Sequence, residues 1–121
     1  MAHEISMGDD GILRMDLIGD TDKEDMEAYI KDLTPFLEAA TEAEPLLILT
    51  DSSRSGKLSS GARKLSAEVN RDPRIGKTAV IGEGRRYFRV MAGFILKATG
   101  RDNIRFFDSE EEALAWLKDE S

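Results

Sequence analysis

Cysteine is absent from this chain of 121 residues, and histidine occurs only once. The lack of cysteine excludes a disulfide framework, a thiolate metal site and a cysteine nucleophile. The single histidine, His3, stands near the N-terminus without an evident partner, and no cluster of metal-ligating residues accompanies it. We therefore expect no metal site, no cofactor and no catalytic residues, and we expect that the protein is not an enzyme.

Long apolar runs are also missing, since none approaches the roughly 20 residues that a membrane-spanning helix needs. The first ten residues, MAHEISMGDD, lack the basic and apolar regions of a secretory signal. With 40% hydrophobic and 34% charged residues, the composition is that of a globular chain. These features predict a single cytoplasmic domain over residues 1–121, with peripheral contact to a membrane as an option.

Charge is unevenly distributed along the chain. Residues 1–51 carry 3 Lys/Arg and 14 Asp/Glu, residues 52–105 carry 13 and 4, and residues 106–121 carry 1 and 6. This pattern predicts one acidic and one basic surface, unless the two charges simply pair with each other. The net charge of −7 argues against nucleic acid as a partner, because the acidic regions would repel phosphates.

The hydrophobic pattern predicts the element order β-β-α-β-α-β-α-β-α, which is an α/β fold. We expect a single-layer, mostly parallel five-stranded sheet with an antiparallel first strand, and residues 51–57 as a polar loop. Capping boxes are predicted for Thr21 with Glu24 and for Ser109 with Glu112. Pro35 is expected to kink or split the first helix near Thr34. The predicted strands cover residues 2–7, 12–18, 46–49, 75–81 and 103–107, and the predicted helices begin near residues 21, 59, 85 and 109.

The third predicted helix, residues 85–98, is both basic and unusually apolar. Its apolar residues cover more than the roughly 100° stripe that an ordinary surface helix buries. Part of it is therefore expected to face a small apolar ligand, a lipid at a membrane surface, or a second copy of the chain, while the alternative is a wide core helix. The residues predicted to contact a ligand or membrane are Arg85, Arg86, Tyr87, Arg89, Val90, Met91, Phe94 and Ile95.

A turn and a loop are predicted at the carboxyl edge of the sheet. Gly82 and Gly84 precede the basic helix, and Ser53 and Arg54 follow the neighbouring strand. Ligands of open α/β sheets gather at this edge, so we expect these four residues to line one crevice that suits an anion. The turn is not a dinucleotide fingerprint, because Tyr87 stands where a third glycine is needed.

Three stretches in this order resemble the SpoIIAA-like family, which is related to STAS domains and similar to the Sec14 or CRAL-TRIO fold. They are LLILTDSSRSGKLSSGARKL, TAVIG and FFDSEEEALAWL. The resemblance covers nearly the whole chain and lies in the order and spacing of the stretches. It implies a small α/β domain with a closing C-terminal helix.

The family resemblance implies two functions. One is a binding module for an apolar ligand or membrane surface, with a helix over a pocket. The other is a regulatory interaction domain that resembles anti-sigma-factor antagonists, in which a kinase phosphorylates a serine within an Asp-Ser-Ser-Gly motif. Ser59 and Ser60 match that motif here, but Leu58 replaces its acid. Ser59 is otherwise expected to cap its helix.

Overall fold

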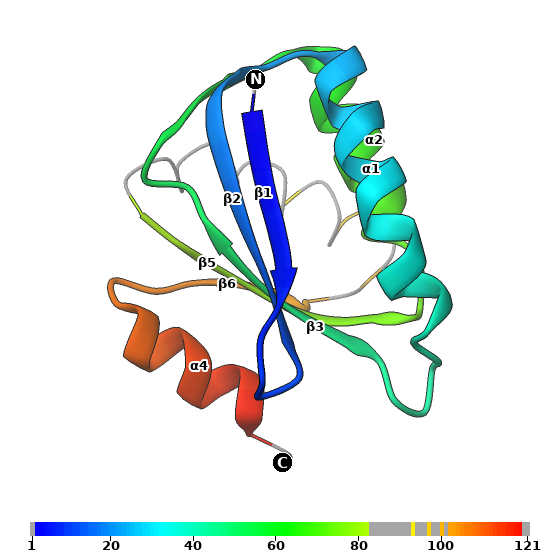
Figure 1. Ribbon diagram of the computed structural model, residues 1–121, viewed down its shortest axis with the longest axis vertical. Helices are drawn as coiled ribbons and strands as arrows, with labels where there is room; N and C mark the ends of the chain where they lie inside the picture. The colour runs from blue at the N-terminus through cyan, green and yellow to red at the C-terminus, as the bar shows by residue number, and fades with distance from the viewer. Residues whose placement is uncertain (1, 83–92, 94–96, 98–99, 101, 120–121) are drawn as a thin grey trace.

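A computed structural model describes residues 2–82, 93, 97, 100 and 102–119 of the chain. Within these residues, helices cover both faces of one mixed sheet (Figure 1). The strands are β1 (Ala2–Met7), β2 (Ile12–Thr21), β3 (Leu46–Asp51), β4 (Ser55–Leu58), β5 (Ile75–Ile81) and β6 (Ile104–Phe106). The helices are α1 (Lys23–Glu38), α2 (Ser60–Val69) and α4 (Glu110–Lys118).

The sheet has the strand order β1-β2-β3-β5-β6. β1 and β2 pair antiparallel, and every further pairing along this path is parallel, as predicted. The hairpin turns at Gly11, whose φ of 78° lies in the left-handed region that favours glycine. The α/β class, the antiparallel first strand and the parallel remainder are thus confirmed.

The structure corrects the predicted loop at residues 51–57. Ser55–Leu58 forms β4, which pairs in parallel with the end of β2 through Gly19 and Thr21. β3 and β4 therefore both pair with β2, β3 with its first half and β4 with its end. Its sequence is polar and holds a glycine, so its strand character comes from pairing with a distant segment and not from local propensity.

The first helix begins one residue later than expected. Asp22, not Thr21, is the N-cap: its Oδ1 accepts a hydrogen bond from Asp25 N at 2.8 Å, and Asp25 Oδ2 accepts one from Asp22 N at 3.0 Å. Thr21 instead ends β2 and is buried. Aspartate is a better N-cap than threonine, and the pairing of Thr21 with Leu58 keeps Thr21 in the sheet.

α1 continues through Pro35 to Glu38 instead of splitting at Thr34. Proline removes the backbone donor that the carbonyl of Lys31 would otherwise receive. The hydroxyl of Thr34 donates to the carbonyl of Ile30 at 2.8 Å, which is a different acceptor. Leu33 before the proline and Leu37 after it both pack against the core. Packing on both sides of Pro35 therefore holds the helix together.

Alternate residues of the strands build two separate apolar clusters. The larger cluster lies between the sheet and helices α1 and α2, and includes Leu17, Tyr29 and Leu33. The smaller cluster lies under α4 and includes Ile12, Ala79 and Leu117. Figure 1 shows α1 and α2 on one side of the sheet and α4 on the other. We call these sides the helix-pair face and the α4 face.

α4 is fixed to the sheet by Lys77 of β5. Lys77 Nζ donates to the carbonyls of Trp116 at 2.9 Å and Asp119 at 2.6 Å, where the helix ends. The ammonium group also lies 5.1 Å from the centre of the Trp116 ring, and Arg105 approaches the same ring at 5.3 Å. A cation at a helix C-terminus is stabilising, and so is a cation over an indole ring.

Candidate functional site

The predicted basic and apolar helix lies outside the described residues. This concerns Arg85, Arg86, Tyr87, Arg89, Val90, Met91, Phe94 and Ile95, together with Gly84. Their predicted contact with a ligand, a membrane or a second chain therefore stays a prediction.

Two of the residues predicted to line a crevice at the carboxyl edge of the sheet, Gly82 and Ser53, pack closely together. Ser52 donates from both its N and its Oγ to the carbonyl of Ile81, at 2.8 and 2.7 Å. Gly82 has a φ of 101°, and a Cβ placed on it would lie 2.5 Å from Ser53 N. Gly82 and Ser53 are thus in contact, while their predicted contact with a ligand stays a prediction. Their close packing is a joint between β3 and β5.

Arg54 points elsewhere. Its Nη2 lies 3.1 Å from Asp16 Oδ2 and 3.7 Å from Glu4 Oε2, so this guanidinium pairs with carboxylates of β1 and β2. Arg54 is consequently not placed for an anion beside Gly82. No local pattern indicates this pairing, because Asp16 lies 38 positions away.

Ser59 and Ser60 lie at the start of α2, and both are exposed. Ser59 Oγ accepts a hydrogen bond from Ala62 N at 3.1 Å, and Ser59 N donates to the carbonyl of Thr21 at 2.9 Å. Ser59 is thus the N-cap of α2, as expected. Ser60 is the first residue of the helix.

An apolar cavity lies on the helix-pair face, and residues of β2, β3, β5, β6, α1 and α2 line it. Its free volume is about 30 Å³. Within the described part of the chain, no charged residue lines it. Burial raises the pKa of Tyr29 in its wall, so the phenol is neutral at physiological pH. The lining residues are Met15, Leu17, Met26, Tyr29, Ile30, Leu33, Ile48, Thr50, Ser66, Val69, Asn70, Ile75, Thr78, Val80 and Ile104.

Thr78 lines this cavity and carries a buried hydroxyl that lacks a hydrogen-bond partner among the described residues. The residue is 8% exposed, and its buried Oγ1 has no hydrogen-bond partner among the described residues. The backbone N of Thr78 donates to the carbonyl of Asn103 at 2.9 Å, so only the side chain is unpaired. A buried hydroxyl without a partner destabilises the fold. No sequence pattern marks Thr78 as a site residue, because threonine is also an ordinary strand residue.

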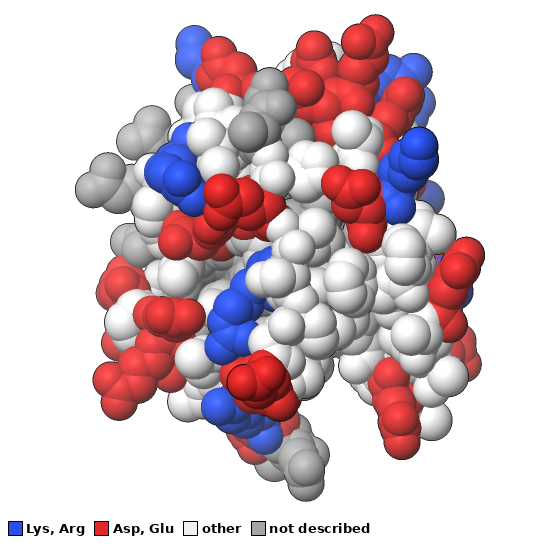
Figure 2. All heavy atoms as spheres, in the orientation of Figure 1, with Lys and Arg blue, Asp and Glu red and all other residues white. Residues whose placement is uncertain are grey.

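The α4 face has a hollow of the opposite character. Glu4, Asp16 and Asp51 stand side by side on β1, β2 and β3 as register partners, and Glu110 of α4 lines the same hollow of about 280 Å³. Figure 2 shows acidic side chains over much of the visible surface, with basic ones among them. These carboxylates do not form a metal centre: in the described part of the chain, no three His, Cys, Asp or Glu residues are placed to hold a cation.

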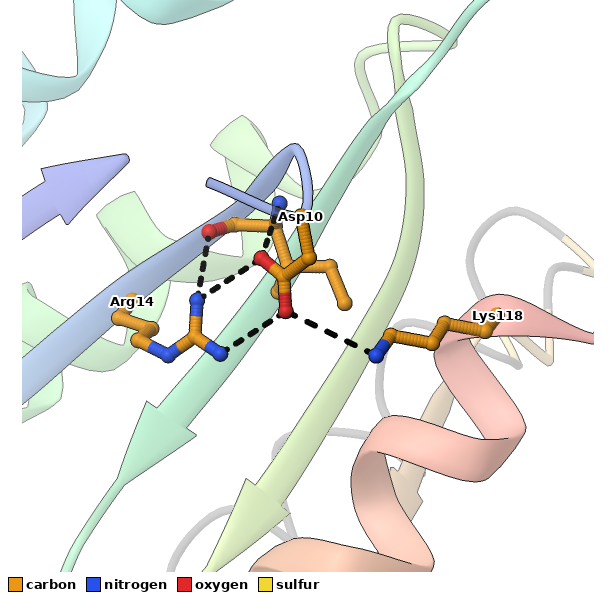
Figure 3. A network of polar contacts seen from close by, with 4 residues as sticks. Asp10, Arg14 and Lys118 are labelled. Atoms are coloured by element: carbon orange, nitrogen blue, oxygen red, sulfur yellow. Dashed lines mark hydrogen bonds and ion pairs between the residues drawn. The ribbon is translucent and has the colours of Figure 1, made fainter. Parts of the chain in front are cut away.

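A polar network joins the first hairpin to α4 (Figure 3). Arg14 donates from Nη1 and Nη2 to the two carboxylate oxygens of Asp10, each at 3.0 Å, and Lys118 Nζ lies 3.9 Å from Asp10 Oδ2. The Arg14 guanidinium, together with the backbone N–H of Ile12, holds the pKa of Asp10 far below its ordinary value. This network connects the hairpin to the end of α4.

His3 has a partner, which the sequence did not reveal. Its Nε2 lies 2.6 Å from Asp32 Oδ2 on α1, and its ring meets the Tyr29 ring edge-on at 5.8 Å between centroids. The pair connects the edge strand β1 to α1. The long separation of the two residues in sequence explains why the pattern around His3 showed nothing.

The comparisons with known proteins agree with this architecture. The SpoIIAA-like family matches residues 12–118, so the chain belongs to the SpoIIAA-like family. Among curated proteins, none is significantly similar to it in sequence.

Two solved structures share its fold. An uncharacterized protein of the DUF3478 family with a SpoIIAA-like fold, from Shewanella loihica PV-4, is 24% identical over 96% of this chain and 92% of its own, with a TM-score of 0.61. The anti-sigma factor antagonist SpoIIAA in its unphosphorylated form is 16% identical over 97% and 98%, with a TM-score of 0.67. At these identities the likeness concerns the fold alone.

Among the described residues, no helix is both long and apolar enough to cross a bilayer.

Proposed function

We propose that this SpoIIAA-like domain is a non-enzymatic binding module for a small apolar molecule or the acyl part of a lipid. The observation that carries the proposal is the apolar cavity between the sheet and helices α1 and α2. Ligand sites are typically concave and mostly apolar with few polar groups. The described lining holds hydroxyl and amide groups but no carboxylate, imidazole or amine, which supports binding over catalysis.

The size of the cavity restricts how a ligand is bound. A free volume of about 30 Å³ holds only one or two water-sized groups. Drug-sized ligands need roughly 300–1,000 Å³, so the walls must move. Met15 and Met26 belong to those walls. Their unbranched side chains change shape easily, and they supply the adaptable part of the site.

Binding is tested with toluene, a small apolar probe, by following backbone amide shifts in NMR. We expect saturable shifts at residues that line the cavity. Val69→Phe, which fills the cavity from α2, should abolish them. The matched control is Leu65→Phe, one turn earlier on the same helix, because Leu65 packs against the core without lining the cavity. Equal binding by all three proteins, or none by the wild type, would contradict the proposal.

Native mass spectrometry of gently purified protein extends the test. A co-purified mass in the lipid range would identify the ligand class. A dimer without added mass would support the alternative of self-association. Peripheral membrane contact through Arg85, Arg86 and Arg89 is tested separately, as loss of vesicle binding when all three become Glu.

A second candidate function is a phosphate-switched interaction domain. The observation in its favour is the exposure of Ser59 and Ser60 at the start of α2, where free backbone N–H groups and the helix dipole stabilise an added phosphate. Its test is a mass increase of one phosphate in protein from its native cell, located by fragmentation. Loss of that increase in Ser59→Ala but not in Ser60→Ala would assign the site, and an unmodified protein would exclude the switch.

A further inference from the structure

We propose that the ligand of the cavity is uncharged and carries one hydrogen-bonding group, such as a hydroxyl or carbonyl, that pairs with the hydroxyl of Thr78. This inference rests on the proposed function and names the ligand class of the same site.

The first observation is the position of Thr78 in the sheet, among apolar residues. On the helix-pair face, register pairing places Leu13, Ile48, Thr78 and Ile104 in one row across β2, β3, β5 and β6. The other three residues of the row are apolar and buried. Thr78 thus brings a single hydroxyl into an apolar row, directly at the cavity wall.

The second observation is that the hydroxyl of Thr78 has no hydrogen-bond partner among the described residues. Valine would fill the space of Thr78 with nearly the same shape and without an unpaired hydroxyl, so packing alone does not account for threonine here. Thr78 Oγ1 is buried and unpaired in the described part of the chain. A ligand with one polar group in the cavity gives this hydroxyl its partner.

The third observation is that no charged side chain lies in the described lining of the cavity. An ionised carboxylate or phosphate in an apolar site needs a cation or several donors to offset its lost hydration. The described lining offers no Lys, Arg or His. The cavity therefore favours an alcohol, ketone, ester or amide over the anion of a fatty acid.

Three probes of similar shape test the inference: toluene without a polar group, benzyl alcohol with a neutral one, and benzoate with a charge. Dissociation constants come from NMR titrations of wild type, Thr78→Val and Thr78→Ser. We expect Thr78→Val to weaken benzyl alcohol about fivefold, the typical loss for one neutral hydrogen bond, and to leave toluene unchanged. Thr78→Ser keeps the hydroxyl and should retain the affinity for benzyl alcohol. Benzoate should not bind to any of the three.

The outcomes separate this inference from the proposed function. If toluene binds and benzyl alcohol is equally tight in wild type and Thr78→Val, the role of Thr78 is wrong while the binding module stands. Saturable benzoate binding at this cavity would overturn the uncharged ligand class. If no probe binds, and a structure shows only one water at Thr78, both proposals fall, because the hydroxyl then serves a buried solvent molecule.

Discussion

The two faces of the sheet are made by alternate residues of the same strands, yet they differ in almost every physical property. The helix-pair face is apolar, with a small cavity and two buried threonines, Thr50 and Thr78. Beyond its small apolar cluster, the α4 face is polar, with a row of carboxylates and a larger hollow. Adjacent residues of β2 lie on opposite faces. Leu17 is buried on the helix-pair face, and Asp16 pairs with Arg54 on the α4 face.

The two faces contribute to different properties of the protein, namely the stability of the fold and the electrostatic potential of the surface. Burial on the helix-pair face stabilises the fold through apolar area. Exposed ion pairs on the α4 face contribute little to stability but determine the potential at the surface. A single unpaired hydroxyl therefore matters more on the first face than an additional charge does on the second.

The largest expected effect compares two neighbours on opposite faces. Leu17→Ala should lower the free energy of unfolding by about 3 kcal/mol, because it leaves a cavity in the core. Asp16→Ala should lower it by less than about 1 kcal/mol, since its ion pair with Arg54 is partly exposed. Urea denaturation of both variants measures the difference. Similar losses would show that the two faces are not energetically distinct.

Thr78→Val should have the next largest effect, and of opposite sign. Removal of the unpaired hydroxyl should raise the free energy of unfolding by about 1 kcal/mol in the absence of ligand. Thr50→Val on the neighbouring strand is the comparison, because Thr50 is also buried but its hydroxyl is not among the unpaired atoms of the described residues. Thermal unfolding measures both. A destabilised Thr78→Val would mean that the hydroxyl already has a partner in solution, such as a buried water.

A smaller gain is expected on the α4 face from Asp51→Asn. Asp51 lies beside Asp16 in the row of carboxylates, and like charges on adjacent strands repel. The asparagine oxygen still accepts the hydrogen bond that Ser53 N donates to Asp51 at 2.9 Å. We expect a gain of about 0.2–0.5 kcal/mol at low salt, which disappears near 1 M salt. Glu42→Gln removes the same charge far from the row and should show no such gain.

The smallest effect concerns pH and the network around Asp10. Because Arg14 lowers the pKa of Asp10 in the folded protein, the contribution of the carboxylate to stability is fully present above its unfolded pKa near 3.8. It is lost as the pH falls from that value through the lower folded pKa. Asp10→Asn should therefore lower the free energy of unfolding slightly at neutral pH, and its difference from the wild type should shrink as the pH falls below about 3.8, which flattens the acid side of the stability curve. An unaltered acid limb would show that other carboxylates dominate it.

Much of the fold followed from local patterns. Alternating and continuous apolar runs predicted five strands near their observed positions, and Ser59 and Ser109 were recognised as caps. The candidate site followed less well. Gly82 and Ser53, which were predicted to line a crevice, are in contact. Arg54 pairs instead with carboxylates that are distant in sequence. Thr78 was not predicted, because no neighbouring residue in the sequence marks an unpaired hydroxyl.

The sequence by itself determined the positions of α1, α2 and α4, the caps of α2 and α4, the hairpin and the membership of the chain in the SpoIIAA-like family, because each depends on residues close together or on their order. Only the tertiary structure decided that Ser55–Leu58 is a strand, that His3 meets Asp32, and that Thr78 faces a cavity. Those features depend on register between segments tens of residues apart. Register is set by the packing of the whole sheet against its helices, and no local pattern encodes it.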